Sequence, residues 1–91
     1  MARLHVRILG RVQGVGFRWF AREEARRLGL SGWVTNRPGG EVELEAGGEP
    51  QSLERLRRAL EVGPPGASVE RLELLQEQSE GQLPYPFSIH R

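Results

Sequence analysis

The sequence predicts an α+β fold in which two helices cover one face of an antiparallel sheet. Short segments with alternating apolar and polar residues indicate strands, and longer segments with apolar residues at helical spacing indicate helices. These segments follow one another in the order β-α-β-β-α-β. The chain has 91 residues, the length of one small domain, so we expect a single domain over residues 1–91.

The first third of the chain is predicted to form a strand, a loop and a helix. Residues 4–11 alternate apolar and polar side chains, which is the period of a half-buried strand. Residues 12–17 contain two glycines that break this period, so we expect a loop there. From Phe17 onward apolar residues recur at helical spacing, and Gly29 is expected to end the helix.

A hairpin is predicted after this helix. Residues 31–37 are rich in aromatic and β-branched side chains and indicate a strand, and residues 38–40 (Pro-Gly-Gly) indicate a turn. In the next strand apolar residues alternate with Glu41, Glu43 and Glu45. We expect the apolar residues to face the core and the three carboxylates to form a solvated face.

The rest of the chain adds a helix and two strands. Pro50 suits the first turn of a helix, and residues 63–65 (Gly-Pro-Pro) are expected to end it. Residues 68–75 indicate a strand, a polar stretch follows, and residues 85–90 indicate a short last strand beside two prolines.

This order is that of a ferredoxin-like α/β sandwich, βαββαβ, with a short extra C-terminal strand. In this arrangement the first two strands run parallel with the third strand inserted between them. Their C-terminal ends then share one edge of the sheet, about 10 Å apart. The loop at residues 12–17 and Asn36, at the end of the second strand, should therefore converge.

The charge balance is nearly neutral, with 13 basic and 12 acidic residues. No overall field attracts nucleic acid or an anionic membrane, so we expect neither as a partner. Arg3, Arg7 and Arg11 interrupt the apolar stretches near the start that could form a signal peptide or a membrane span. The sequence therefore predicts a cytoplasmic protein, and we expect a monomer.

Cysteine, lysine and aspartate are missing from the chain. Their absence excludes disulfides, thiolate metal sites, Schiff bases and aspartyl phosphates. His5 and His90 stand apart from any second metal-ligand motif, so we expect neither a metal nor a cofactor. Trp33 is expected in the core, whereas Trp19 could lie near the mouth of the loop or simply pack on the helix.

The loop at residues 12–17 is the first candidate binding site. Main-chain N–H groups at a helix N-terminus bind anions, but Gly14 and Gly16 are equally explained by a tight strand-to-helix connection. Arg18 lies in the first helical turn, where the helix dipole disfavours a cation by about 0.3 to 1 kcal/mol. A bound phosphate reverses that sign and matches the planar guanidinium. The alternative is that Arg18 is a solvated surface charge.

Asn36 is the second candidate, and it is the only asparagine in the chain. The predicted topology puts it beside the loop. Asparagine is also frequent where a turn begins, and Pro38 restricts Arg37 to extended conformations. Asn36 could therefore serve only the turn.

Two segments resemble the signatures of the acylphosphatase family in order and spacing. They are residues 10–18 (GRVQGVGFR) and residues 32–36 (GWVTN). The resemblance continues through residues 40–43 and residues 63–64, and so spans nearly the whole chain. Thr35 departs from the family, which commonly has a longer polar or basic residue there.

The resemblance implies an enzyme that hydrolyses the carboxyl-phosphate bond of acyl phosphates and releases a carboxylate and inorganic phosphate. It implies two catalytic residues, Arg18 to bind the phosphoryl group and Asn36 to orient the attacking water. Because the loop contains no Ser, Thr, Cys, His or acidic residue, we expect direct attack by water rather than a phosphoenzyme. The phosphate-binding residues implied are Gln13, Gly14, Val15, Gly16, Phe17 and Arg18.

Two other functions stay open at this point. Ferredoxin-like sheets can bind RNA on exposed strand aromatics, although Glu41, Glu43 and Glu45 argue against it because they repel phosphates. The other is a non-catalytic domain that binds phosphate or carbamoyl phosphate, because similar domains occur at the front of a hydrogenase-maturation carbamoyltransferase. No residue pattern indicates which acyl group is bound.

Overall fold

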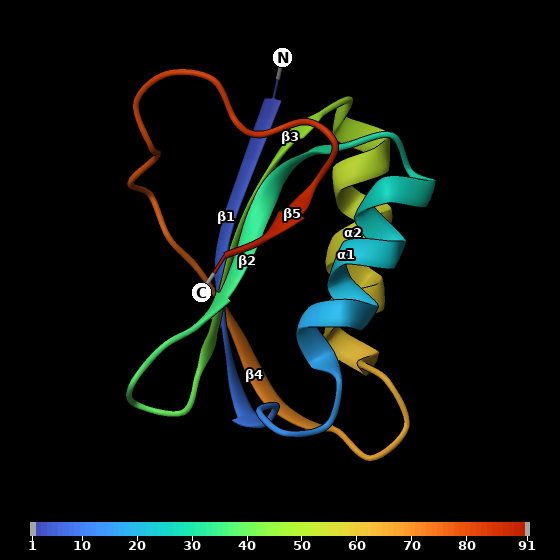
Figure 1. Ribbon diagram of the computed structural model, residues 1–91, viewed down its shortest axis with the longest axis vertical. Helices are drawn as coiled ribbons and strands as arrows, with labels where there is room; N and C mark the ends of the chain where they lie inside the picture. Colours follow the sequence, from blue (N-terminus) through green and yellow to red (C-terminus); the bar gives the residue numbers. More distant parts are fainter. Residues whose placement is uncertain (1, 91) are drawn as a thin grey trace.

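The computed structural model describes residues 2–90, and its elements follow the predicted order. Both helices cover the same face of one sheet (Figure 1), so the predicted ferredoxin-like α+β arrangement is confirmed. The strands pair in the order β4-β1-β3-β2-β5. The strands are β1 (Ala2–Arg11), β2 (Ser31–Asn36), β3 (Val42–Gly48), β4 (Ser68–Leu74) and β5 (Ser88–Ile89), and the helices are α1 (Phe17–Arg27) and α2 (Pro50–Val62).

The central strands have the predicted directions. β1 and β2 each pair antiparallel with β3, so they run parallel to each other with β3 between them. Their C-terminal ends therefore share one edge of the sheet. This edge is the lower end of Figure 1, where the loop after β1 (blue) and the turn between β2 and β3 (green) both lie.

The last strand makes the sheet mixed rather than purely antiparallel. β5 pairs parallel with β2, through residues 88–89 alone. The strand expected over residues 85–90 is shortened to these two residues because Pro86 has no N–H group to donate to a ladder. Phe87 is fully buried and anchors this short strand against the core.

The core fills the space between the helices and the sheet. α1 buries Phe17, Ala21 and Ala25, and α2 buries three leucines at helical spacing. Together with the inner face of the sheet they form one continuous hydrophobic cluster, which fixes the start of α1 above the lower edge of the sheet. The sheet residues that contribute to it include Val6, Ile8, Val34, Val42, Leu44 and Ala46.

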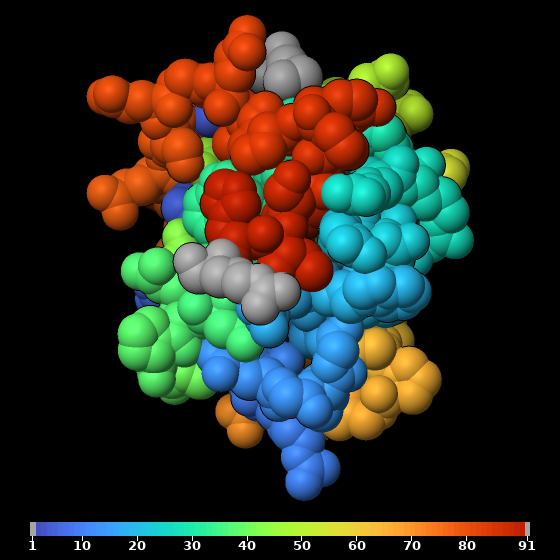
Figure 2. All heavy atoms as spheres, in the orientation of Figure 1, coloured from blue at the N-terminus to red at the C-terminus, as the bar shows by residue number. Residues whose placement is uncertain are grey.

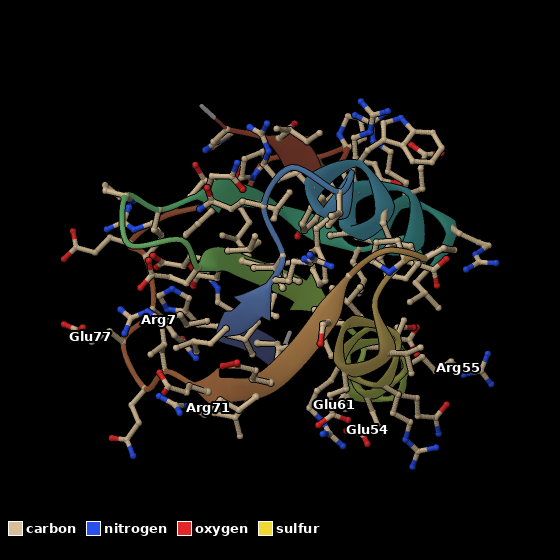
Figure 3. All side chains as sticks on the ribbon, turned by 90° about the horizontal axis from the view of Figure 1, so that it is seen from below. Arg7, Glu54, Arg55, Glu61, Arg71 and Glu77 are labelled. Carbon is tan, nitrogen blue, oxygen red and sulfur yellow. The ribbon has the colours of Figure 1, made fainter. Side chains whose placement is uncertain are left out.

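The outer face of the sheet differs from the prediction. Glu45 is completely buried, and the side chains of Glu43 and Glu41 are only 12% and 23% exposed. Figure 3 shows Arg7 and Glu77 on this side, away from the helices. The expectation of a solvated face is wrong because the polar stretch after β4 folds back over the carboxylates.

We call residues 75–82 the strap, because this segment crosses the outer face (Figure 1, and orange at the upper left of Figure 2). Glu45 holds it through a hydrogen bond from the main-chain N–H of Ser79 at 3.0 Å. Arg3 pairs with Glu45 at 3.4 Å and donates to the Ser79 carbonyl at 2.8 Å. The buried carboxylate therefore has partners on both the strand and the strap.

Trp33 is also on the outer face rather than in the core. It is half-buried, stacks on His90 with ring centroids 6.0 Å apart and meets the edge of His5 at 5.8 Å. Val34, its neighbour, points to the helices and is fully buried. The prediction for Trp33 is wrong because successive residues of a strand face opposite sides of the sheet.

Candidate active site

The loop after β1, the first turn of α1 and the end of β2 enclose a pocket of about 180 Å³. In Figure 2 the loop and the start of α1 (light blue) lie below the last strand (red) and beside the β2–β3 turn (green). Arg18 and Asn36 both line this pocket, so the structure brings them together. The lining residues are Val12, Gly14, Gly16, Phe17, Arg18, Trp19, Asn36 and Ile89.

The loop contributes Gly14 and Gly16 to the lining of the pocket. Gly14 and Gly16 have φ values of 78° and 75°, a left-handed conformation that glycine adopts without strain. Gly16 is also the N-cap of α1, and no side chain caps this helix end. The first helical hydrogen bond runs from Phe20 N to Gly16 O, so the amides before Phe20 have no acceptor within the helix. They can donate to an anion in the pocket.

The guanidinium of Arg18 has no charged or hydrogen-bonding partner in the part of the chain that the structure describes. Among residues 2–90 it is the one half-buried arginine that makes neither a salt bridge nor a side-chain hydrogen bond; Arg11 and Arg55 also lack partners, but both are exposed. Its guanidinium lies at the positive end of the α1 dipole, with no acidic residue in the first turn. These observations favour an anion site over a solvated surface charge.

Asn36 is not used by the turn that follows it. The turn is closed by main-chain hydrogen bonds from Arg37 N to Glu41 O at 2.9 Å and from Gly40 N to Arg37 O at 3.1 Å. The Oδ1 atom of Asn36 is buried and has no hydrogen-bond partner within residues 2–90. Asn36 itself lines the pocket, and no described residue is a hydrogen-bond partner of its carboxamide, so this side chain is not committed to the turn.

Gln13 and Val15 are placed differently from the other loop residues. Neither lines the pocket. The Gln13 amide points toward the β2–β3 turn and donates to the carbonyls of Arg37 at 2.8 Å and Glu41 at 3.0 Å. Val15 is half-buried and packs against the core. Any contact of these two residues with phosphate therefore comes from their main-chain amides.

The sequence allows for one apolar side chain of the pocket, Trp19, but not for another, Ile89. The sequence allows Trp19 either to lie near the mouth of the loop or to pack on the helix; in the structure it lines the pocket, with 59% of its surface exposed. Ile89 also lines the pocket, and the sequence does not indicate it. It reaches the pocket because β5 pairs with β2, a long-range contact that no local pattern around residues 85–90 indicates.

Within residues 2–90, no group of three or more His or carboxylate side chains is placed to hold a metal ion. Arg18 is the one charged side chain among the residues that line the pocket. No helix of the described residues is long and apolar enough to cross a membrane. The described lining of the pocket thus combines glycines at a helix N-terminus with one guanidinium and one carboxamide.

Comparison with known proteins identifies the family of the chain. The acylphosphatase family model matches residues 4–89. An acylphosphatase of Thermococcus kodakarensis is 52% identical over 79 residues, which is 87% of each chain. The crystal structure of an acylphosphatase from Bacillus subtilis matches over the full length of both chains, with a TM-score of 0.89 and 37% identity.

A longer protein shares the same architecture. The crystal structure of T. kodakarensis HypF matches all of this chain with a TM-score of 0.84 and 30% identity, but the match covers only 12% of HypF. The acylphosphatases, in contrast, match along most of their own length. With a family model that spans residues 4–89 and relatives that are about half identical, the chain belongs to the acylphosphatase family and hydrolyses acyl phosphates.

Proposed function

We propose that the main-chain amides of residues 13–17 and the guanidinium of Arg18 bind the phosphoryl group, and that Asn36 orients the attacking water. One observation carries this proposal. Arg18, which is half-buried, and Asn36 line the same pocket, and the Arg18 guanidinium and the Asn36 Oδ1 atom have no partner in the described chain. A phosphoryl group supplies the anion that Arg18 lacks, and the Asn36 carboxamide beside it is left to contact a water molecule.

The reaction needs little covalent machinery. A carboxylate is a good leaving group, so the enzyme has to position the phosphoryl group and stabilise its charge. The cradle fixes the phosphoryl oxygens, and Asn36 holds a water in line with the bond that breaks. The water oxygen bonds to phosphorus, the bond between phosphorus and the bridging oxygen breaks, and the carboxylate leaves with the bonding electron pair.

The proton of the water goes to the substrate in this proposal. The described residues that line the pocket include no His, Glu, Ser, Thr or Tyr, so they offer neither a general base nor a nucleophile. In a loose transition state the water needs little deprotonation at first, and a phosphoryl oxygen can take the proton later. A pH–rate profile with an essential group titrating in the range of a Glu or His would contradict this route.

The position of attack is tested by hydrolysis in water enriched in the heavy oxygen isotope. We expect the label in inorganic phosphate and none in the carboxylate, because water attacks phosphorus. Label in the carboxylate means attack on the acyl carbon and overturns the proposal. Inversion of configuration at a chiral phosphoryl group is expected for direct attack, whereas retention indicates a phosphoenzyme.

The non-catalytic accessory domain that the sequence left open is not favoured, because the likeness to HypF covers only 12% of that protein, whereas the acylphosphatases match along most of their own length. The RNA-binding alternative loses its support, since Trp33 is covered by His90 and the outer face is occupied by the strap.

We further propose that residues 1–91 act as a single cytoplasmic domain and a monomer. Arg3, Arg7 and Arg11 all lie in β1. This strand pairs with β3 on one side and with β4 on the other, so the charged segment is part of the folded sheet. The large exposed hydrophobic side chains come from four separate elements or loops rather than one patch. Sedimentation should give a mass near 10.2 kDa, and a mass twice that value would contradict the monomer.

A further inference from the structure

The strap is fastened to the fold at its two ends (Figure 1). At the first end Leu75 N donates a hydrogen bond to the His5 carbonyl at 2.8 Å, and just beyond the other end Leu83 is buried. Residues 76–82 between these points are all exposed and carry no apolar side chain. The middle of the strap therefore depends on the polar contacts that it makes with the outer face of the sheet.

Three side chains of the sheet supply these contacts. Arg3 donates to the Ser79 carbonyl at 2.8 Å, and Glu45 accepts from the main-chain N–H of Ser79 at 3.0 Å. His5 holds the strap at a separate point, where its Nδ1 atom lies within hydrogen-bond distance of the Glu77 carbonyl. Of these three residue types, histidine is the one that ordinarily changes its charge near neutral pH.

Both ring nitrogens of His5 face hydrogen-bond acceptors. Nδ1 faces the Glu77 carbonyl, and Nε2 lies 2.6 Å from Oε2 of Glu43. The other oxygen of Glu43 pairs with Arg37 Nε at 3.1 Å, so both oxygens of this carboxylate are engaged as acceptors. A neutral imidazole has one N–H group and serves only one of its two acceptors, whereas an imidazolium serves both.

The surroundings of His5 support the protonated ring. Burial lowers the pKa of His5, but the hydrogen bonds to the Glu77 carbonyl and to Glu43, with the charges of Glu45 and Glu43, raise it above its ordinary value. The three arginines nearby are each paired with a carboxylate. The charged residues that surround His5 are Arg3 and Arg7 of β1, Glu43 and Glu45 of β3, Arg37 of the turn after β2 and Glu77 of the strap.

We propose that the strap is a proton-dependent latch, closed over the outer face of the sheet while His5 is protonated and open when His5 is neutral. A neutral ring keeps its one N–H group on Nε2, because a hydrogen bond to a carboxylate is stronger than one to a carbonyl. The lone pair of Nδ1 then faces the Glu77 carbonyl and repels it. Residues 76–82 become mobile as the pH rises, while both ends of the strap stay fastened.

The latch is tested by NMR relaxation of the Cα–H groups of residues 77–81 from about pH 5 to about pH 9. These groups do not exchange with water, so they can be followed at the alkaline end. We expect order parameters of about 0.85 at the acid end and below about 0.6 at the alkaline end. The midpoint should coincide with the titration of the His5 imidazole in the same samples, and Leu83 should stay ordered throughout.

Two variants assign the transition to His5. His5→Phe keeps a ring but cannot hold either acceptor, so the strap should be mobile over the whole range. His90→Gln is the matched control, because His90 is exposed and does not contact the strap, and it should keep the wild-type transition.

Three results would overturn the latch. They are a wild-type strap that stays ordered over the whole range, a midpoint that departs from the His5 titration, and a transition that persists in His5→Phe. If His5→Phe does not fold, the comparison of the two midpoints in the wild type still decides. The lining of the phosphate pocket includes none of these residues, so the latch stands or falls independently of the proposed function.

Discussion

The side chain of Gln13 donates a hydrogen bond to the main-chain carbonyl of Arg37 across 2.8 Å. It also donates to the carbonyl of Glu41 at 3.0 Å, on the other side of the same turn. Arg37 directly follows Asn36 at the end of β2. The phosphate loop is therefore tied to the strand end that carries Asn36, and the two halves of the site are held at a fixed distance.

Loss of this tie should reduce turnover. We expect Gln13→Leu to lower kcat about tenfold, because a small displacement of a positioning group is costly to a reaction that depends on alignment. The free energy of unfolding should fall by about 1 kcal/mol for the lost hydrogen bonding. Steady-state kinetics and urea unfolding measure the two effects. Gln51→Leu, an exposed glutamine in the first turn of α2, is the control; equal kcat in both variants would refute the tie.

Gly16 should be needed for its backbone conformation. A Cβ atom at Gly16 meets nothing within 4 Å, so the cost of Gly16→Ala comes from the left-handed φ of 75° and amounts to about 1 to 2 kcal/mol of stability. A shift of the N-cap out of this conformation also turns the cradle amides away. Phosphate should then inhibit the variant less strongly, as measured by its competitive inhibition constant.

Gly66 offers a matched comparison for Gly16. It also has a positive φ, of 91°, with open space at its Cβ position, but it lies in the loop between α2 and β4 and does not line the pocket. Gly66→Ala should lose similar stability and keep wild-type inhibition by phosphate. Equal weakening of phosphate binding in both variants would attribute the effect to general destabilisation.

His5 should make stability depend on pH. Burial opposes its charge, but the hydrogen bonds to the Glu77 carbonyl and to Glu43, with the charges of Glu45 and Glu43, raise the pKa of His5 above its ordinary value. Its contribution to stability is fully present below the unfolded pKa of about 6.5 and is lost as pH rises through the higher folded pKa. Urea unfolding of the wild type should therefore show stability falling over this range.

The pH dependence should weaken in one histidine variant and persist in the other. His5→Gln removes the group that titrates between the strap and β3, so its stability should change less with pH. His90→Gln replaces the exposed histidine and should keep the wild-type dependence. An imidazole signal of His5 whose pKa lies below the ordinary histidine value of about 6.5 in NMR spectra would contradict the assignment.

The inner face of the fold could be predicted from the sequence because it depends on local patterns. The alternation in β3 and the helical spacing in α2 put Leu44 and Leu56 in the core, and the strand order then brings Arg18 and Asn36 to one edge. The position of the loop could be predicted as well, because Gly14 and Gly16 interrupt the strand pattern locally. Each of these inferences uses neighbours that are close in the sequence.

The outer face could not be predicted because it depends on distant contacts. Nothing near Glu45 in the sequence indicates that Ser79 will fold back to bind it. The alternation of apolar residues and carboxylates in β3 therefore predicts that Glu45 faces the solvent. Ile89 enters the pocket only through the parallel pairing of β5 with β2. The same limitation applies to the direction of the Gln13 side chain, which is set by the turn carbonyls it reaches.

The division of labour between Arg18 and Asn36 is tested most directly by turnover and phosphate inhibition in Arg18→Ala and Asn36→Ala. Arg55→Ala, an exposed arginine of α2 without a partner in the described chain, serves as the control for loss of one positive charge. Arg18→Ala should weaken both substrate binding and inhibition by phosphate about tenfold or more, because it removes charged hydrogen bonds. Asn36→Ala should keep phosphate inhibition and lower kcat about a hundredfold, because the water loses its alignment. Full turnover by Asn36→Ala would contradict the central claim.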